Sequence, residues 1–417
     1  MTMNAKRRRA HDKLAALPGV RAVRRPVRRS SDDQFDLYYV RAGRKSAHPL
    51  VVIPGGPGAA SVGLYRGFRR RAAAEGLDVI MVEHRGIGLS RHDDQGADLP
   101  PEALTIEQVV DDVAAVLDDA GVDKAVIYGT SYGTYLAAGF GVRHPDRVHA
   151  MVLDSPVLSA ADIDAVRAET RRLLWSGDDP ETADLAPKVR RLVDHDVLTP
   201  AATQLAMAVY GFAGPTLLQR QLDLLLTGRR WLWSGMALAT RLVLERKAPY
   251  RHEPDLVNRI AYRELNYGAT PDGKPLDPAV AYREADTDTI EFDAEPFDLV
   301  AEMPNFTWPT VVISGGRDLI TPPTVARRIA SLIQNSVLVN LATAGHSIID
   351  LREGAAMEIV AAIYDGTVER LPERETALDS KPAGLGVRAL IWGIEAAATL
   401  ESAVPAALPR TVRRVTS

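Results

Sequence analysis

The sequence of 417 residues contains no cysteine. Disulfide bonds, thiolate metal sites and a cysteine nucleophile are therefore excluded, so any catalysis must use other groups. A large excess of charge is also missing: the formal net charge is −4, which points to no polyanionic partner, and we expect no nucleic-acid binding. Hydrophobic residues at 46% and charged residues at 25% are typical of a globular protein.

Long uninterrupted apolar segments are missing too. No run reaches the ~18 apolar residues that a membrane span requires. The nearest one, residues 383–408, is interrupted by Arg388 and Glu395. We interpret it as a terminal helix docked on the core, with an interfacial membrane helix as the alternative. The basic start of the chain lacks the apolar centre of a signal peptide, so we predict a cytoplasmic protein and expect no membrane contact.

The order of apolar patterns predicts the fold class. Short β-rich runs and helix-like stretches alternate from about residue 35 to 156 and again from 308 to 346. The helix predicted after residue 104 carries apolar residues at helical spacing and begins with a capping box of Thr105 and Gln108. Such alternation predicts a mostly parallel sheet with helices on both faces, an α/β fold.

The alternation stops between the two segments, where helices and loops predict an inserted lid, or cap. We therefore divide the chain into five parts. They are a basic N-terminal tail at 1–17, the first part of the α/β core at 18–158, the lid at 159–301, the second part of the core at 302–375, and a C-terminal extension at 376–417 that we expect to be helical.

One serine stands where a strand is predicted to turn sharply into a helix. The sequence GTSYG places Ser131 between Gly129 and Gly133, after the apolar run KAVIYG and before a helix-like stretch. This turn strains the backbone of the central residue and exposes its hydroxyl at the start of the helix, while the glycines allow close packing. We predict that Ser131 is a nucleophile; an ordinary tight turn is the alternative.

A serine nucleophile needs a histidine to take its proton. His346 follows the last predicted strand, in a glycine-bearing loop at the carboxyl edge of the sheet where ligands bind in such folds. His84 in VEHRG is the one rival, because it also follows a strand on that edge. We predict His346 as the base and expect His84 to shape the pocket.

The histidine in turn needs a carboxylate to orient it. Asp318 follows a strand and gives the chain order Ser, Asp, His that is typical of this kind of site. A helix N-cap is the other interpretation of Asp318, although Thr321 can serve that purpose. Asp154, after the preceding strand, competes for the role of acid, and we favour Asp318.

The segment VVIPGGPGAAS predicts the remaining catalytic part. Two glycines in a rigid turn after a strand can direct a backbone N–H into the site beside that of Tyr132. We assign Gly56, and less directly Gly55, to an oxyanion hole. No Lys-Ser/Thr pair follows, so the segment is not read as a phosphate loop.

These motifs together resemble the α/β-hydrolase fold, and within it the prolyl aminopeptidase and tripeptidyl-aminopeptidase-like family of serine peptidases. The resemblance is carried by PGGPG, EHRGIGLS, GTSYGTYLA, RVHAMVLDSP, GGRDLITPP and AGHS, all outside the lid. It implies a triad of Ser131, Asp318 and His346. Pro54 stands where the family has histidine, and Glu83 with His84 where it has an aspartate-glutamine pair.

The resemblance also implies a lid carboxylate that holds the free amine of a peptide. The segment AYRELNYG is similar to the family's segment, which would make Glu264 this anchor; a solvated glutamate on a lid helix is the alternative. The lid side chains Phe212, Trp231, Trp233 and Met236 either line a substrate pocket or pack the lid, and packing is the commoner role of such side chains.

We therefore predict a serine hydrolase that works through an acyl-enzyme. Removal of N-terminal residues from short peptides is favoured, hydrolysis of small esters is the alternative, and a non-catalytic protein that binds a small ligand is the third hypothesis. None of these needs a cofactor or metal, and no residue spacing matches a known set of metal ligands. The sequence does not indicate an oligomeric state.

Overall fold

The computed structural model describes residues 3–29, 31–245, 248–285 and 289–403. Its described strands form an eight-stranded sheet in the order β1-β2-β4-β3-β5-β6-β7-β8. The strands are β1 (Val20–Pro26), β2 (Gln34–Ala42), β3 (Leu50–Ile53), β4 (Val79–Val82), β5 (Ala125–Thr130), β6 (Val148–Asp154), β7 (Thr310–Gly315) and β8 (Ser336–Leu341). Strands β3 to β8 are parallel, and β2 lies antiparallel to both β1 and β4. The predicted α/β fold is confirmed.

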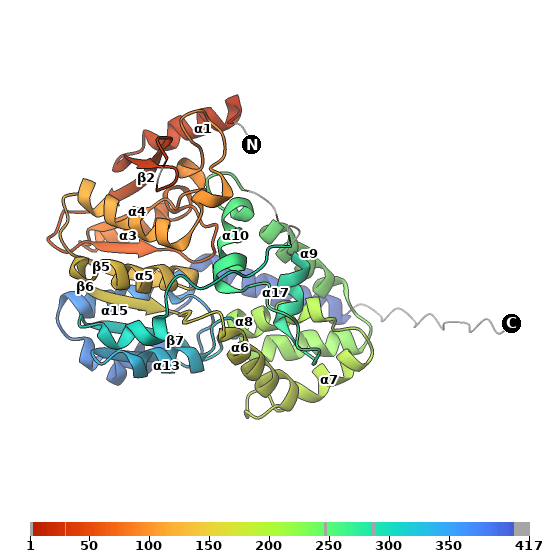
Figure 1. Cartoon of the computed structure of the whole chain (residues 1–417). Coiled ribbons are helices and arrows are strands. Elements are labelled where there is room, and N and C mark those ends of the chain that lie inside the picture. The colour runs from red at the N-terminus through yellow and green to blue at the C-terminus, as the bar shows by residue number, and fades with distance from the viewer. Residues whose placement is uncertain (1–2, 30, 246–247, 286–288, 404–417) are drawn as a thin grey trace.

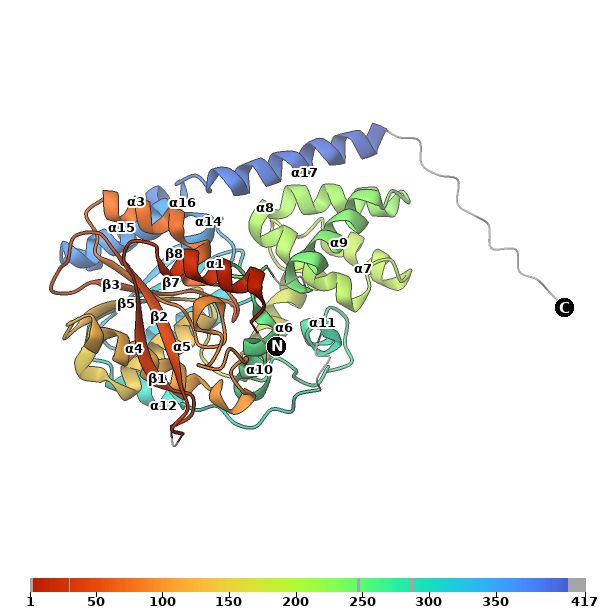
Figure 2. The same cartoon turned by 90° about the horizontal axis from the view of Figure 1, so that it is seen from above.

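Helices cover both faces of this sheet, as Figure 2 shows from above. Those of the core are α2 (Ser61–Leu64), α3 (Arg66–Ala74), α4 (Ile106–Asp119), α5 (Tyr132–Arg143), α13 (Pro323–Leu332), α14 (Ile348–Leu351), α15 (Glu353–Tyr364) and α16 (Glu375–Asp379). Strand β5 shows why two layers form. Its buried side chains alternate: Ile127 packs toward α4, α5 and α13, whereas Val126 and Tyr128 pack toward α3 and α15.

The chain between β6 and β7 is mainly helical, and most of its helices lie beside the sheet domain (Figure 1), whereas the last of them, residues 299–302, packs against α5 on one face of the sheet. These helices are α6 (Asp162–Arg171), α7 (Ala186–Asp194), α8 (Pro200–Leu226), α9 (Trp231–Glu245), α10 (Pro254–Leu265), α11 (Pro278–Ala285) and α12 (Leu299–Glu302). Helix α8 is interrupted at Gly214, where φ is +83° and Pro215 follows. We call the segment α6–α11 the lid. Helices α6 to α9 bury an apolar cluster of their own, separate from the two layers of the sheet, whereas the buried apolar side chains of α10 join one of those layers.

Both ends of the described chain contact the lid, and the C-terminal helix that we expected on the core lies on the lid instead. The basic segment near the N-terminus forms helix α1 (Ala5–Ala15), and its Arg7 forms an ion pair with the buried Glu253 just before α10. At the other end, α17 (Leu385–Ala403) runs along α8 and α9, where Ile394 and Ala398 are buried (Figure 2). Residues 1–2 of the predicted tail and 404–417 of the predicted extension lie outside the described residues. No helix in the described ranges has the length and apolarity to cross a membrane.

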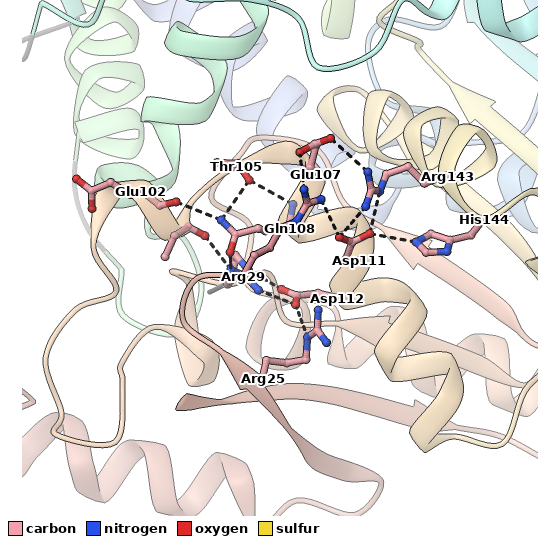
Figure 3. A network of polar contacts seen from close by, with 12 residues as sticks. Arg25, Arg29, Glu102, Thr105, Glu107, Gln108, Asp111, Asp112, Arg143 and His144 are labelled. Atoms are coloured by element: carbon pink, nitrogen blue, oxygen red, sulfur yellow. Dashed lines mark hydrogen bonds and ion pairs between the residues drawn. The ribbon is translucent and has the colours of Figure 1, made fainter. Parts of the chain in front are cut away.

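A polar network on α4 fixes the loop that follows β4. Arg85, with 1% of its surface exposed, donates two hydrogen bonds to Asp112, of 2.6 and 2.7 Å, and one of 2.7 Å to Gln108 Oε1. Arg25 of β1 reaches the same carboxylate, as Figure 3 shows. Thr105 caps α4 as predicted, but the capping box is wrong: the Gln108 side chain donates to the Glu102 carbonyl and to Thr105 Oγ1. The demand of buried Arg85 for an acceptor accounts for the difference.

We expect Asp112→Ala to lower the free energy of unfolding by about 3 kcal/mol, because it leaves the guanidinium of Arg85 buried without its carboxylate. Arg29→Ala removes ion pairs of the same network to Glu107 and Asp111, but the Arg29 side chain is 55% exposed. Its cost is expected to stay within about 1 kcal/mol. Urea unfolding followed by circular dichroism measures both. Equal costs for the two variants would contradict this account of the network.

Candidate active site

Ser131 lies at the turn between β5 and α5. Its φ is +53° and its ψ is −126°, a strained conformation for a residue with a side chain. The flanking glycines are sterically required. A Cβ on Gly129 would lie 2.3 Å from the Gly133 carbonyl oxygen, and a Cβ on Gly133 would lie 2.2 Å from the Ile53 carbonyl oxygen. The tight turn leaves the serine partly exposed at the carboxyl edge of the sheet.

His346 and Asp318 come together with Ser131 at this edge. His346 Nε2 lies 2.8 Å from Ser131 Oγ, and His346 Nδ1 lies 2.8 Å from Asp318 Oδ2. Asp318 follows β7 and His346 follows β8, so both reach Ser131 from loops at the ends of parallel strands. With the Nδ1 proton directed at Asp318, Nε2 is left to accept the serine proton.

The surroundings of Asp318 keep it ionised. Burial favours its neutral form, but the charge and hydrogen bond of His346 and the backbone N–H groups of Thr321 and Ile320 outweigh burial, and the pKa of Asp318 is lowered. The pKa of His346 moves the other way: burial lowers it, but the Asp318 charge outweighs burial and the net shift is upward. The imidazolium that forms after proton transfer is thus stabilised. Thr321 also donates its hydroxyl to Asp318 Oδ2 at 2.8 Å.

His84, the rival histidine, lies on the other side of the nucleophile turn. Its Nδ1 lies 2.6 Å from the Arg85 carbonyl oxygen, and its Nε2 lies 3.3 Å from the Tyr132 hydroxyl. Burial lowers the pKa of His84 to about 4, so the ring is neutral, with Nδ1–H donated and Nε2 accepting from Tyr132. This arrangement fits a residue that shapes the pocket wall.

The glycine-rich turn after β3 lies against the serine. A Cβ on Gly55 would lie 3.0 Å from Ser131 Cβ and 3.6 Å from its Oγ, so a larger residue here would crowd the serine. Gly56 has φ +126°. Gly55, His84 and Tyr132 are among the residues that line a cavity of about 30 Å³ here. The N–H groups of Gly56 and Tyr132 remain the predicted oxyanion donors.

Glu264 already has partners for both of its carboxylate oxygens. One accepts the N–H of Ile106 at the start of α4 at 2.8 Å, and the other pairs with Arg263 at 2.5 Å. Burial raises the pKa of Glu264. Of the lid side chains considered from the sequence, Phe212, Trp233 and Met236 pack in or against the lid cluster, and Trp231 is 53% exposed.

A second cavity, of about 70 Å³, lies between the lid and the core. It borders Thr321 and is lined by apolar side chains, by Tyr267 and Tyr282, and by Asp162 at the start of α6. Burial raises the pKa of Asp162 to about 6, and its Oδ2 accepts the N–H groups of Leu158 and Ser159. Sequence reasoning missed this carboxylate, because nothing in the pattern DIDAVRAET distinguishes it from a solvated helix start. Among the described residues, no cluster of three His, Asp or Glu side chains is arranged to hold a metal ion.

Asp154, the competing acid, has other partners. Its carboxylate accepts the Tyr128 hydroxyl and the N–H groups of Ile348 and Ile349, and no contact with the His346 ring is seen. It lies behind the histidine loop rather than beside the imidazole.

Comparison with known proteins identifies the core. A sequence model described as alpha/beta hydrolase fold matches residues 48–178. Proline iminopeptidases are similar over part of the chain: that of Neisseria meningitidis is 28% identical over 117 residues, and that of Arabidopsis thaliana is 30% identical over 125 residues. These matches cover 28% and 29% of the chain, and 35% and 30% of the relatives. The chain thus spans about a third of the length of the curated relatives that it matches.

The structural comparison covers a larger share of a relative than the sequence comparison does. A solved proline iminopeptidase from Mycobacterium smegmatis superposes with a TM-score of 0.53 at 17% identity, covering 84% of this chain and 99% of that one. At this identity the match shows the fold alone. The resemblance stated from the motifs is confirmed: the chain is an α/β-hydrolase-fold protein, and part of its sequence is similar to proline iminopeptidases.

Proposed function

We propose that this protein is a serine hydrolase that acts through an acyl-enzyme, with Ser131, His346 and Asp318 as its catalytic triad. The observation that carries the proposal is the continuous pair of 2.8 Å hydrogen bonds from Ser131 Oγ through the imidazole to Asp318. This is the arrangement that turns a weakly nucleophilic hydroxyl into an effective one. The partial exposure of Ser131 supports access by a substrate.

In the first half of the proposed reaction, Ser131 Oγ attacks the substrate carbonyl carbon while its proton passes to His346 Nε2. Asp318 stabilises the imidazolium, and the N–H groups of Tyr132 and Gly56 bind the oxyanion. His346 then gives its proton to the leaving group as the bond breaks. In the second half, His346 takes a proton from water, the resulting hydroxide attacks the acyl-enzyme, and Ser131 recovers its proton.

We propose short peptides with a free N-terminus as the substrates, so that the enzyme acts as an aminopeptidase like the proline iminopeptidases. The sequence similarity to those enzymes, 28% identity over 117 residues for that of Neisseria meningitidis, supports this choice. A free α-ammonium group requires a carboxylate near the serine. Glu264 is one candidate, although both of its oxygens are engaged, and Asp162 in the cavity beside Thr321 is the other.

The alternative activity is hydrolysis of small esters. The mostly apolar lining of the cavity beside Thr321 favours it, because an acyl chain needs no charged partner.

The cytoplasmic location stays a prediction from the sequence.

Peptide and ester hydrolysis are separated by comparing aminoacyl p-nitroanilides with their N-acetylated forms and with p-nitrophenyl esters. An aminopeptidase is expected to lose about 10- to 100-fold in kcat/KM when the amine is blocked, because a charged hydrogen bond is lost. Asp162→Asn and Glu264→Gln identify the anchor: the variant that removes it loses the preference for a free amine. If blocking the amine makes no difference while esters are cleaved, the aminopeptidase proposal fails and the esterase alternative holds.

The pH dependence follows from the proposed base. Neutral His346 is the active form and its pKa is raised, so kcat/KM is expected to rise with pH through a pKa above the usual value near 6.5. In Asp318→Asn the raising charge is lost while burial remains, so this pKa falls, and kcat falls by about 10⁴-fold because the tautomer is no longer fixed.

The measurement is a pH profile of kcat/KM for the wild type, for Asp318→Asn and for a control variant, Asp94→Asn. Asp94→Asn, which removes a carboxylate paired with Arg24 on the surface, is the control and leaves the profile unchanged. An Asp318→Asn profile with its acidic limb at the wild-type position would argue against the assigned acid.

A further inference from the structure

Three serines with positive φ lie at or near the proposed triad. Ser131, Ser155 and Ser347 have φ values of +53°, +54° and +64°. Such values cost free energy for residues other than glycine, so surrounding contacts must hold them. Ser131 precedes α5, Ser155 follows β6, and Ser347 directly follows His346. The backbone is thus strained at the proposed nucleophile, Ser131, at the residue after the proposed base, Ser347, and at the residue after β6, Ser155.

Asp154 and Ser155 together hold the chain that follows the histidine. Three consecutive backbone N–H groups point at this pair. That of Ser347 donates to Ser155 Oγ at 2.9 Å, that of Ile348 to Asp154 Oδ1 at 3.0 Å, and that of Ile349 to Asp154 Oδ2 at 2.9 Å. The Asp154 carbonyl oxygen also accepts the N–H of Ser131 at 2.9 Å. One residue therefore contacts the backbone on both the nucleophile side and the base side of the triad.

The Asp154 carboxylate is fully buried, and its two oxygens accept four hydrogen bonds. Besides the two backbone groups, the Tyr128 hydroxyl donates at 2.8 Å and the Ser155 hydroxyl at 3.2 Å. All four are neutral donors, and this set favours the charged form. Burial opposes it and raises the pKa of Asp154. The triad chemistry does not use this buried carboxylate, whose hydrogen bonds go to the backbone and side chains around the histidine loop.

A second set of contacts closes the cluster around Ser347. Its hydroxyl donates to Asp350 Oδ2 at 2.5 Å and lies 2.9 Å from Thr130 Oγ1, at the end of β5 just before the nucleophile. Asp350 Oδ1 in turn accepts the Tyr65 hydroxyl at 3.0 Å. The groups that face His346 and its loop are thus Asp318 from the loop after β7, Asp154 from β6 and Asp350 from α14, with the phenols of Tyr128 and Tyr65 behind the last two.

We propose that Asp154 is a positioning residue: its carboxylate holds residues 347–349 against the ends of β5 and β6, so that the imidazole of His346 stays within hydrogen-bond distance of Ser131 Oγ. The proposal rests on the proposed acyl-transfer function. The charge has a second effect, because Asp154 and Asp350 add to Asp318 in favouring the protonated imidazole. Asp154 therefore supports the base by placement and by charge without touching its ring.

The experiment compares Asp154→Asn with Ser155→Ala and with Asp78→Asn. Asparagine has nearly the same shape, but its NH2 group would face a donor in place of an acceptor oxygen, so the loop must shift. Ser155→Ala removes the acceptor of the Ser347 N–H and leaves the Asp154 charge. Asp78 is another buried carboxylate, which accepts a backbone N–H from Ser46 and forms an ion pair with Arg41, but it lies at the opposite edge of the sheet, before β4. It controls for the cost of disturbing any buried carboxylate.

We expect kcat of Asp154→Asn to fall by about 100-fold, with KM within about twofold, because displacement of a catalytic group by about 1 Å has an effect of this size. The acidic limb of its pH profile moves to lower pH. For Ser155→Ala we expect a smaller fall in kcat than for Asp154→Asn, and an acidic limb of the pH profile at the wild-type position. Asp78→Asn lowers the thermal midpoint and changes neither kcat nor the limb.

The proposal is overturned if Asp154→Asn and Ser155→Ala keep the wild-type kcat and pH limb, or if their losses match those of Asp78→Asn. If Asp154→Asn does not fold, Ser155→Ala decides by its kcat at constant KM. If the wild type turns over no peptide or ester, the acyl-transfer function fails instead. NMR titration of His346 then decides: an unchanged His346 pKa and ring environment in both variants refutes the positioning role.

Discussion

The hydrogen bond between Ser131 Oγ and His346 Nε2 joins residues 215 positions apart in the chain. It forms because both residues follow strands of one parallel sheet, whose carboxyl ends all lie at the same edge. Neither end of the bond is placed by an ordinary turn. Ser131 has a strained backbone that requires Gly129 and Gly133 beside it, and the chain directly after His346 is strained at Ser347. The sheet brings the two segments near each other. In our proposal, the hydrogen bonds of Asp154 and Ser155 then hold Ser131 and His346 within hydrogen-bond distance.

Electrostatics separates the two histidines that share this edge. The pKa of His346 is raised because Asp318 outweighs the effect of burial, whereas the pKa of His84 is lowered to about 4 because burial is not offset by a carboxylate within hydrogen-bond distance. The first histidine is therefore suited to taking and returning a proton, and the second to staying neutral beside Tyr132. The same argument applies to the carboxylates: Asp318 contacts an imidazole, while Asp154 contacts neutral donors and serves the backbone.

Much of this arrangement could be predicted from the sequence, because the relevant signals are local. The alternation of apolar runs predicts the sheet, and the GTSYG, GGRDLITPP and AGHS segments each follow a strand. Other features depend on contacts that no local pattern reveals. Strand β1 was not predicted, because its sequence VRAVRRP is rich in arginine, which suits an exposed edge strand but also a solvated tail. The backbone N–H of Ile106 that Glu264 accepts, and those of Ile348 and Ile349 that Asp154 accepts, come from segments far away in the chain. These contacts are therefore visible only in three dimensions.

The most direct test of the central claim is to label the folded protein with a fluorophosphonate and map the modified residue by peptide mass spectrometry. An activated serine reacts rapidly, so the account predicts stoichiometric modification of Ser131 alone, absent in Ser131→Ala, strongly slowed in His346→Ala, and lost when the wild type is unfolded in urea. Labelling of another residue, or no labelling of Ser131 in the folded protein, would contradict the claim that the imidazole activates this hydroxyl.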